Sequence, residues 1–390
     1  MWPNVRYYRL ALCVIVLLCF GSLAYTLSSL KSQAEDVCQA SELSVRDNPL
    51  PFAAVRTIST QGLPEDRVAT ALKRLLPEQN SSHCNVLLHE LHLWASRQAD
   101  TGHVWPGGQP SGLFFDTDAA NQRFGKPIHI RRRFGYEYVQ ALKLEDQGER
   151  HTYQVLATLG EIGVSSRQPV KIQGESLTVA GAIRWMAANL EPGQELEWAV
   201  VAASLYLPPQ KSWRNKFNQV IDFDALCSWL CDRPHGKGSC MGTHTLYALA
   251  VLVACDSNEH VLSPDSRNRA IARLTEAATI LSAGQRPDGC WLGKWYPDHP
   301  DLEEANPLTV PRHELLVTGH HLEWLALIPS EIPLRDGMVE SGCAYLTGTI
   351  LQESPELLKK YFCPYTHAGS ALSLWSPGAR QRALGLKDTE

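Results

Sequence analysis

Short apolar stretches recur along the chain and predict its architecture. Six carry a histidine or glutamate near their start or middle, and they begin at Cys84, Tyr153, Glu195, His244, Val317 and Cys363. The stretch from His244 is apolar in every direction of a helix, which is typical of a helix buried on all sides. Amphipathic helices such as residues 264–283 separate several of these stretches. Buried and amphipathic helices in alternation indicate an array of helical hairpins.

The remaining pattern also favours helices. Helical periodicity covers residues 66–76, 83–97, 179–189 and 356–361, whereas only residues 126–134 and 169–177 resemble short strands, as edge hairpins. The sequence therefore predicts a predominantly α, all-α class fold.

A glycine-rich turn precedes the most apolar of these helices. Gly236, Gly238 and Gly242 allow a close approach of the backbone, and Thr243 is expected to cap the helix that follows. His244 then stands at the start of a buried helix. A polar group in that position needs either a hydrogen-bond partner or a ligand.

The N-terminal region predicts a membrane anchor. Arg6 and Arg9 precede an uncharged, apolar segment at residues 10–30, long enough to cross a bilayer. The positive charges predict a cytoplasmic N-terminus (residues 1–9) and a large domain on the periplasmic, extracytoplasmic side, with the membrane as a partner. A cleaved signal peptide is the alternative. Residues 31–52 then form a linker, residues 53–384 one domain and residues 385–390 a tail.

Charge argues against nucleic acid as a partner. The chain has 36 Lys and Arg against 41 Asp and Glu, and its net charge is −5. No basic run exceeds the triplet at residues 131–133. A nucleic-acid surface needs a concentrated basic patch.

The cysteines leave two interpretations open. Eleven are present, and a run of metal-competent side chains follows the spacing C-x3-C-x3-H-x4-C-x3-H: Cys227, Cys231, His235, Cys240 and His244. Cys240 and His244 are the candidate metal ligands. The alternative is that the cysteines are small buried side chains, or that some form disulfides.

The segment at residues 284–295 carries a more specific pattern. Gln285, Asp288, Gly289 and Trp291 match Q-x-x-D-G-x-W, which resembles the QW-type repeat of the terpenoid cyclase and protein prenyltransferase superfamily. The resemblance implies an α/α toroid, in which an inner ring of helices surrounds a central cavity and the repeat joins an outer helix to the next inner one. The acid cluster of squalene-type cyclases and the zinc pattern of prenyltransferases are absent from the sequence, so those activities are not implied.

A second resemblance concerns residues 318–327, TGHHLEWLAL. This segment is similar to an inner helix of the N-acylglucosamine 2-epimerase-like sugar isomerases, in which a histidine faces the cavity. The resemblance implies that His320 or His321 forms an acid–base set with Glu323, and that His244 is a partner from a neighbouring helix. The alternative is that each side chain is satisfied locally.

Four further side chains are candidates for substrate contacts: Trp105, Tyr247, Trp324 and His367. Glu161 and Glu197 lie in apolar stretches, where a carboxylate needs a partner or a function. An ion pair at a helix end is the alternative for both.

Two functions from different classes follow. The first is an enzyme that uses the inner histidines on a carbohydrate or a prenyl-type lipid, and the second is a non-catalytic binding or scaffold module of the same fold. The sequence has no nucleophile elbow, phosphate loop or Rossmann glycine pattern and indicates no particular cofactor. Convergence of histidines from three hairpins on one point favours the enzyme. We expect His244 and His320 to line one pocket with aromatic neighbours.

Overall fold

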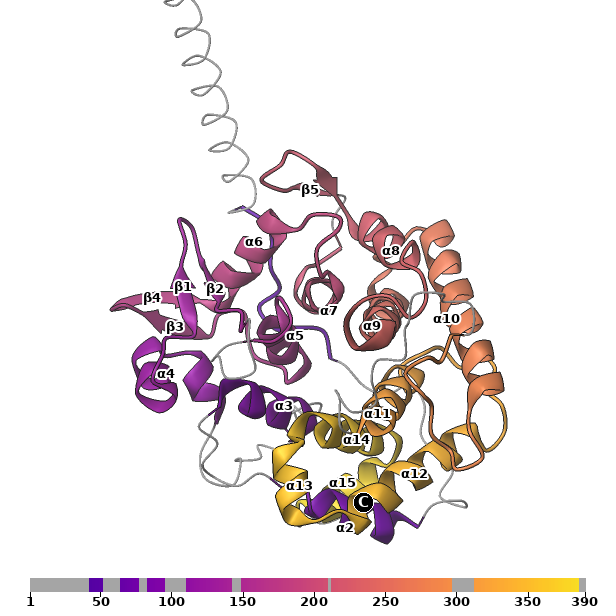
Figure 1. Cartoon of the computed structure of the whole chain (residues 1–390). Helices are drawn as coiled ribbons and strands as arrows, with labels where there is room; N and C mark the ends of the chain where they lie inside the picture. The colour runs from indigo at the N-terminus through magenta and orange to yellow at the C-terminus, as the bar shows by residue number, and fades with distance from the viewer. Residues whose placement is uncertain are drawn as a thin grey trace, which may run out of the picture.

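Helices dominate the computed structural model (Figure 1). The structure describes residues 42–51, 64–76, 83–94, 110–141, 149–209, 212–296 and 312–385. Within these residues the only sheets are three antiparallel pairs of short strands. The predominantly α class predicted from the sequence is therefore confirmed.

Six buried helices form the centre of the molecule, and they correspond to the six apolar stretches. They are α3 (Cys84–Trp94), α5 (Gln154–Glu161), α7 (Glu197–Tyr206), α9 (Thr243–Glu259), α11 (His313–Leu325) and α14 (Phe362–Trp375). Each contacts the next in this order, and α14 contacts α3 (Figure 1). The contacts between these helices therefore close a cycle.

The inner helices are buried because they lack a polar face. Every residue of α7 is buried, as is every residue of α9 from Thr243 to Val253. Burial of apolar surface on all sides of a helix is the main contribution to its stability in such a position. The few polar residues on these helices are consequently forced into the interior, where they have to find partners.

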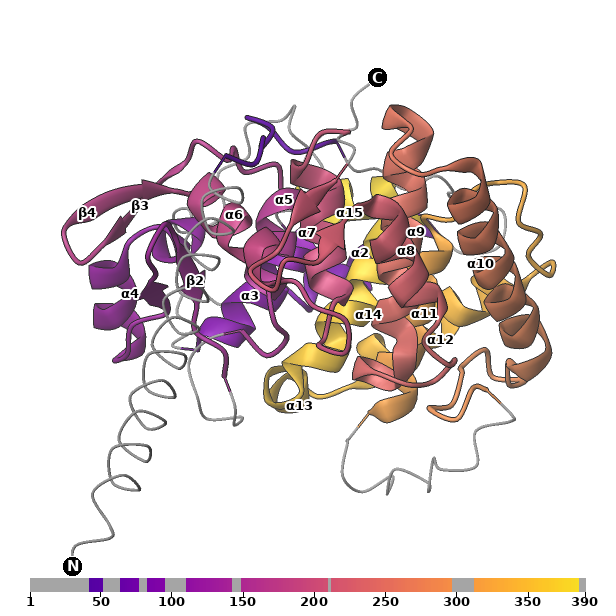
Figure 2. The same cartoon turned by 90° about the horizontal axis from the view of Figure 1, so that it is seen from above.

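Amphipathic helices cover the inner ones. They are α2 (Glu65–Lys73), α6 (Val179–Asn189), α8 (Phe223–Cys231), α10 (Pro264–Gly284), α12 (Met338–Gln352), α13 (Pro355–Lys360) and α15 (Pro377–Ala383). Helix α10 lies outside α8 and α9 and contacts both (Figure 2). It begins as its sequence predicts, because the Ser263 side chain accepts from the Ser266 N–H and Pro264 occupies the first turn.

The strands form hairpins at the edge of the helical core. Strands β1 (His129–Arg131) and β2 (Tyr136–Tyr138) pair, as do β3 (Pro169–Ile172) and β4 (Glu175–Thr178). The predicted segment at residues 126–134 contains β1 but ends before β2, whereas the segment at residues 169–177 contains β3 and all but the last residue of β4. The third pair, β5 (Trp213–Arg214) and β6 (Val220–Ile221), was not predicted because two-residue strands leave no alternating pattern. Short helices η1 (Pro110–Phe114), α4 (Thr117–Phe124) and η2 (Ser239–Gly242) complete the described elements.

The turn after α10 ties three helices together. The Trp291 indole is fully buried and donates to the Leu281 carbonyl in α10 at 2.9 Å, while its backbone N–H donates to Thr318 Oγ1 in α11 at 3.0 Å. The Gln285 amide donates to the Met338 carbonyl in α12. Gly289 has φ +93°, and an added Cβ would lie 2.2 Å from the Ser341 carbonyl oxygen. The predicted burial of Trp291 against α10 is confirmed.

Two predictions from the sequence are wrong. Thr243 does not cap α9, because Gly242 occupies the cap position with φ +73° and the Thr243 hydroxyl donates to the Cys240 carbonyl. The transmembrane and signal-anchor assignment is also corrected: among the described residues, no helix is both long and apolar enough to cross a membrane. Residues 10–30, on which that assignment rested, lie outside the described residues, and the assignment is withdrawn.

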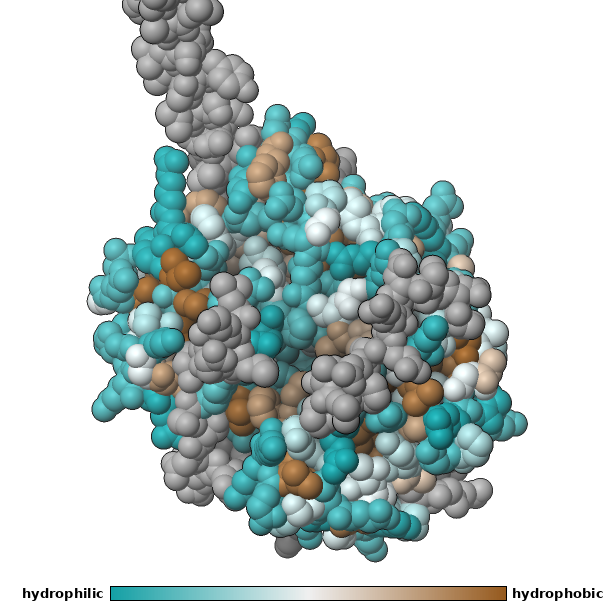
Figure 3. Space-filling view, viewed as in Figure 1, coloured by the Kyte–Doolittle hydropathy of each residue, from teal (hydrophilic) through white to brown (hydrophobic). Residues whose placement is uncertain are grey.

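The outer surface agrees with this packing. The face in Figure 3 is mostly hydrophilic, with hydrophobic residues scattered over it. Large apolar side chains that remain exposed in the described part of the chain include Leu76, Phe217, Val220 and Leu292.

Replacement of Trp291 by alanine tests the importance of the turn after α10. The variant loses a fully buried aromatic side chain and its hydrogen bond to Leu281, and we expect a loss of about 3–5 kcal/mol in the free energy of unfolding. Chemical denaturation measures it, with Leu292→Ala, an exposed neighbour, as the control. A loss for Trp291→Ala no larger than for Leu292→Ala would contradict the packing described.

Candidate functional site

One buried carboxylate lies at the centre of a group of histidines. Glu323 of α11 interacts with three imidazoles: His320 Nδ1 at 3.0 Å, His367 Nδ1 at 3.1 Å and His92 Nε2 at 3.2 Å. These histidines belong to α11, α14 and α3 respectively. Glu323 is 2% exposed, and the three histidines are buried. Three inner helices therefore meet at a single charged side chain.

A glycine allows this meeting. Gly319 of α11 packs directly against the backbone of α14, since an added Cβ would lie 2.9 Å from the Ala368 nitrogen. This close approach places Glu323, one turn later, beside His367.

His92 lies between two carboxylates. Its Nδ1 is 2.8 Å from Glu161 Oε2 in α5, while its Nε2 faces Glu323. The Tyr247 hydroxyl of α9 donates to the other oxygen of Glu161 at 2.6 Å. We call His92, His320, His367, Glu161 and Glu323 the central cluster.

His92 and His320 have different pKa values because their surroundings differ. Burial lowers the pKa of His92, but Glu161 and Glu323 together outweigh burial and raise it to about 9. Burial and the neighbouring His367 lower the pKa of His320 to about 4, despite its bond to Glu323. Burial would raise the pKa of Glu323, yet the three imidazoles hold it well below the usual value. At neutral pH His92 is thus protonated and His320 neutral, beside the ionised Glu323.

His320 has a fixed tautomer and an unused nitrogen. Since the Glu323 carboxylate can only accept, His320 Nδ1 carries the proton and Nε2 carries the lone pair. Nε2 is buried and has no hydrogen-bond partner among the described residues. The rings of His320 and His367 are 3.9 Å apart. A buried, neutral, oriented imidazole of this kind can accept a proton from a bound molecule.

A second group of side chains adjoins the central cluster. The His244 ring lies 4.9 Å from the His320 ring and 4.7 Å from that of His151. His151 Nδ1 is 2.6 Å from Glu195 Oε1. One donor atom from each of His151, Cys240 and His244 lies within 4.8 Å of the others. We call His151, Cys240, His244 and Glu195 the Cys240 site.

The backbone at Cys240 is strained. Cys240 (φ +48°) and Met241 (φ +57°) both adopt the left-handed conformation, between Gly238 and Gly242. For residues other than glycine this conformation costs roughly 1–3 kcal/mol each. The surrounding structure compensates, for example through the Trp295 indole, which donates to the Met241 carbonyl. The strain holds the Cys240 thiol beside His244.

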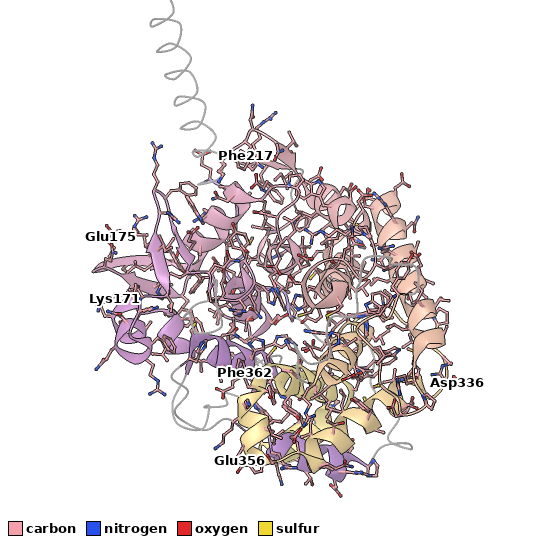
Figure 4. The ribbon with its side chains drawn as sticks, in the orientation of Figure 1. Lys171, Glu175, Phe217, Asp336, Glu356 and Phe362 are labelled. Atoms are coloured by element: carbon pink, nitrogen blue, oxygen red, sulfur yellow. The ribbon has the colours of Figure 1, made fainter. Side chains whose placement is uncertain are left out.

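Exposure increases from the central cluster toward the Cys240 site. The side chains of His151 and Glu195 are 22% and 21% exposed, compared with 3% for Glu323. In the view of Figure 4, Phe362 at the start of α14 lies nearer the middle of the molecule than Lys171, Glu175, Asp336 and Glu356, which lie near its outline. Because His151 and Glu195 are the more exposed of these side chains, solvent reaches the Cys240 site and the central cluster from their side.

A separate pocket of about 340 Å³ does not belong to this site. Its lining includes Ala254, Cys255 and Arg267. Ala254 lies ten residues beyond His244 in α9, or about 15 Å along the helix. None of the residues that line it belongs to either group.

The structure brings together most of the residues predicted from the sequence. His244, His320 and Glu323 converge as expected. His367 bonds to Glu323, and the Tyr247 hydroxyl donates to Glu161. His321 and Trp324 point elsewhere: the Trp324 indole donates to His321 Nδ1, and His321 packs against Trp291 and Trp295. Trp105 lies outside the described residues.

The predicted run of metal-competent residues separates into parts. The sulfur atoms of Cys227 and Cys231 in α8 are 3.9 Å apart, and His235 pairs with Glu276 in α10. Only Cys240 and His244 join the central groups. The eight cysteines of the described residues are free thiols, so the disulfide alternative does not hold for them.

Several important residues were missed at the sequence level. Four of them precede or lie within apolar stretches: His89 and His92 in α3, His151 and Glu195. A polar side chain at such a position was the signal that could have identified them. Glu161 belongs to the central cluster. Glu197 instead bonds to Arg233 and Thr245, which corresponds to the ion-pair alternative.

Comparison of the chain with family models, with curated proteins and with solved structures gives no match. The resemblances to toroid families, and the extracytoplasmic location, stay predictions.

The raised pKa of His92 predicts a pH-dependent stability. A group whose pKa is higher in the folded state than in the unfolded state stabilises the fold while it is protonated. For His92 this contribution is complete below the unfolded pKa of about 6.5 and is lost as pH rises through the folded pKa of about 9. We expect His92 to contribute on the order of 3 kcal/mol at pH 6, most of it absent by pH 10. Chemical denaturation across this range measures it.

The comparison of variants isolates this contribution from other titrating groups. His92→Gln should remove the decrease in the free energy of unfolding between about pH 6.5 and 9. Glu161→Gln should shift this decrease to lower pH, because His92 then keeps only one carboxylate partner. An unchanged slope in both variants would show that His92 is not protonated in the folded protein.

Proposed function

We propose that this chain is an enzyme of the α/α-toroid type, which moves a proton on a carbohydrate at the carbon next to its carbonyl group. The toroid assignment is supported by the closed cycle of contacts from α3 through α14 and by the turn that joins α10 to α11 through Trp291. It agrees with both resemblances in the sequence.

The observation that carries the proposal is the convergence on Glu323. Imidazoles from α3, α11 and α14 reach one carboxylate, which is the arrangement expected of a catalytic centre rather than of separately satisfied side chains. A scaffold has no need for a buried imidazole with an unused nitrogen, and His320 Nε2 is one.

The geometry supports a reaction in which one histidine is the base. His320 Nε2 takes a proton from the carbon next to the carbonyl, so that the C–H bond breaks and an enediolate forms. His320, which then carries protons on both nitrogens, returns one to a carbon of the intermediate, and His367, held by the same carboxylate and 3.9 Å from His320 between ring centres, helps to fix the position of the His320 ring. The protonated His92, whose two nitrogens face Glu161 and Glu323, keeps both carboxylates ion-paired beside the reacting molecule. The net change is an isomerisation or epimerisation, without oxidation.

The polarity of the site favours a sugar over a prenyl-type lipid. The side chains that meet between α3, α11 and α14 are imidazoles and carboxylates, which suit a hydroxyl-rich molecule. Trp198, whose ring centre lies 5.0 Å from that of His244, adds an aromatic side chain to the same group, and aromatic rings commonly pack on sugars.

Solvent exchange tests the reaction directly. The purified chain is incubated in deuterated water with a panel of aldoses, ketoses, N-acetylated amino sugars and uronic acids, and proton NMR follows deuterium incorporation next to the carbonyl. We expect exchange with at least one sugar. His320→Asn should reduce its rate by roughly 10²–10⁴-fold because the base is lost, and Glu323→Gln should also reduce it because His320 loses its orientation.

The matched control is His129→Asn. His129 is an equally buried histidine in β1 that bonds to Phe114 and Thr117, and its replacement should leave the exchange rate unchanged. Circular dichroism confirms folding of each variant. Sugar binding without exchange would identify a binding module instead, and the absence of both binding and exchange across the panel would overturn the substrate class.

A further inference from the structure

The Cys240 site combines the donor atoms that a zinc ion binds. One atom from each of His151, Cys240 and His244 lies within 4.8 Å of the other two. Zinc accepts thiolate sulfur and imidazole nitrogen at about 2.0–2.3 Å, which separates tetrahedral ligands by about 3.5 Å. The three donors therefore need to approach one another only slightly.

His244 indicates that a ligand belongs there. It is 2% exposed, yet neither of its ring nitrogens has a hydrogen-bond partner among the described residues. A buried imidazole with both nitrogens unsatisfied is costly, because it has given up its bonds to water without replacement. Its neighbours Thr243 and Thr245 in α9 are buried as well, so the histidine is not part of a polar surface.

His151 is already oriented as a metal-bound histidine is. Its Nδ1 faces Glu195 Oε1 at 2.6 Å, which leaves the lone pair on Nε2. Glu195 also accepts from the Ser239 hydroxyl, immediately before Cys240, and from the Thr152 N–H. A carboxylate behind the ligating imidazole is the usual arrangement in zinc proteins.

We infer that His151, Cys240 and His244 bind one zinc ion, with Glu195 positioning His151. Binding replaces the Cys240 thiol proton with the metal, so one proton is released to solvent for each ion bound. With three protein ligands the fourth position stays open, as in catalytic rather than structural zinc sites. The inference goes beyond the proposed proton transfer and does not depend on it.

The other groups of metal-competent side chains fit less well. His92, Glu323 and His367 already satisfy one another. The group of His89, Cys363 and His367 shares His367 with the central cluster, and His89 Nδ1 is bonded to the Asn85 carbonyl. Neither group has an imidazole with two unsatisfied nitrogens.

Cobalt substitution tests the site without reference to activity. The full chain is stripped with a chelator under reducing conditions and titrated with Co²⁺, and zinc affinity is measured by competition with a chromophoric chelator. We expect one equivalent to bind, with a thiolate-to-cobalt charge-transfer band. Glu195→Gln should weaken zinc binding by about 10–100-fold, because the orientation of His151 is lost.

Substitutions at Cys240 assign the ligand. Cys240→Ser should abolish the charge-transfer band. Cys240→Gly should do so as well and should fold readily, since glycine adopts φ +48° without strain. Cys363→Ser and Cys231→Ser are the matched controls and should keep the band. Retention of the band in both Cys240 variants, or no stoichiometric binding by the parent chain, would overturn the site. Metal binding by a parent chain that shows no sugar exchange would overturn only the proposed function.

Discussion

The charge of Glu323 is the constraint on which the interior depends. A carboxylate that is 2% exposed is stable only when its charge is balanced, since the desolvation of one ion costs several kcal/mol. Its three imidazole partners come from α3, α11 and α14, and α3 and α14 are the helices at which the cycle of contacts closes. The positions of the three helices are therefore coupled through one side chain, and the close approach at Gly319 is what allows it.

The same carboxylate determines how its neighbours behave. His92 gains a second carboxylate, Glu161, and its pKa rises to about 9, whereas burial dominates for His320 and its pKa falls to about 4. The two histidines therefore differ in protonation state at neutral pH: His92 is a cation and His320 is a neutral base. His244 connects this pair to the Cys240 site, because its ring lies 4.9 Å from that of His320. A zinc ion at the Cys240 site would lie beside the proposed base.

The sequence predicted the helices better than it predicted the site. Apolar stretches without a polar face identify α3, α5, α7, α9, α11 and α14, and local signals at Ser263 and Trp291 gave correct contacts. The meeting of His244 and His320 was also predicted. Glu161 was recognised as a carboxylate that needs a partner, but that partner, His92, was missed because it is distant in the chain. Neighbouring residues point about 100° apart on a helix, so the pair His320–His321 was ambiguous until packing fixed which one faces inward.

The protonation states of His92 and His320 decide whether the arrangement around Glu323 is the one described. Nitrogen-15 NMR of the imidazole rings, with assignments from His92→Gln and His320→Asn, distinguishes a protonated ring from a neutral one. At pH 7 we expect His92 to carry protons on both nitrogens and His320 to carry one on Nδ1 only. A neutral His92, or a protonated His320, would contradict the arrangement around Glu323 from which the proposed function follows.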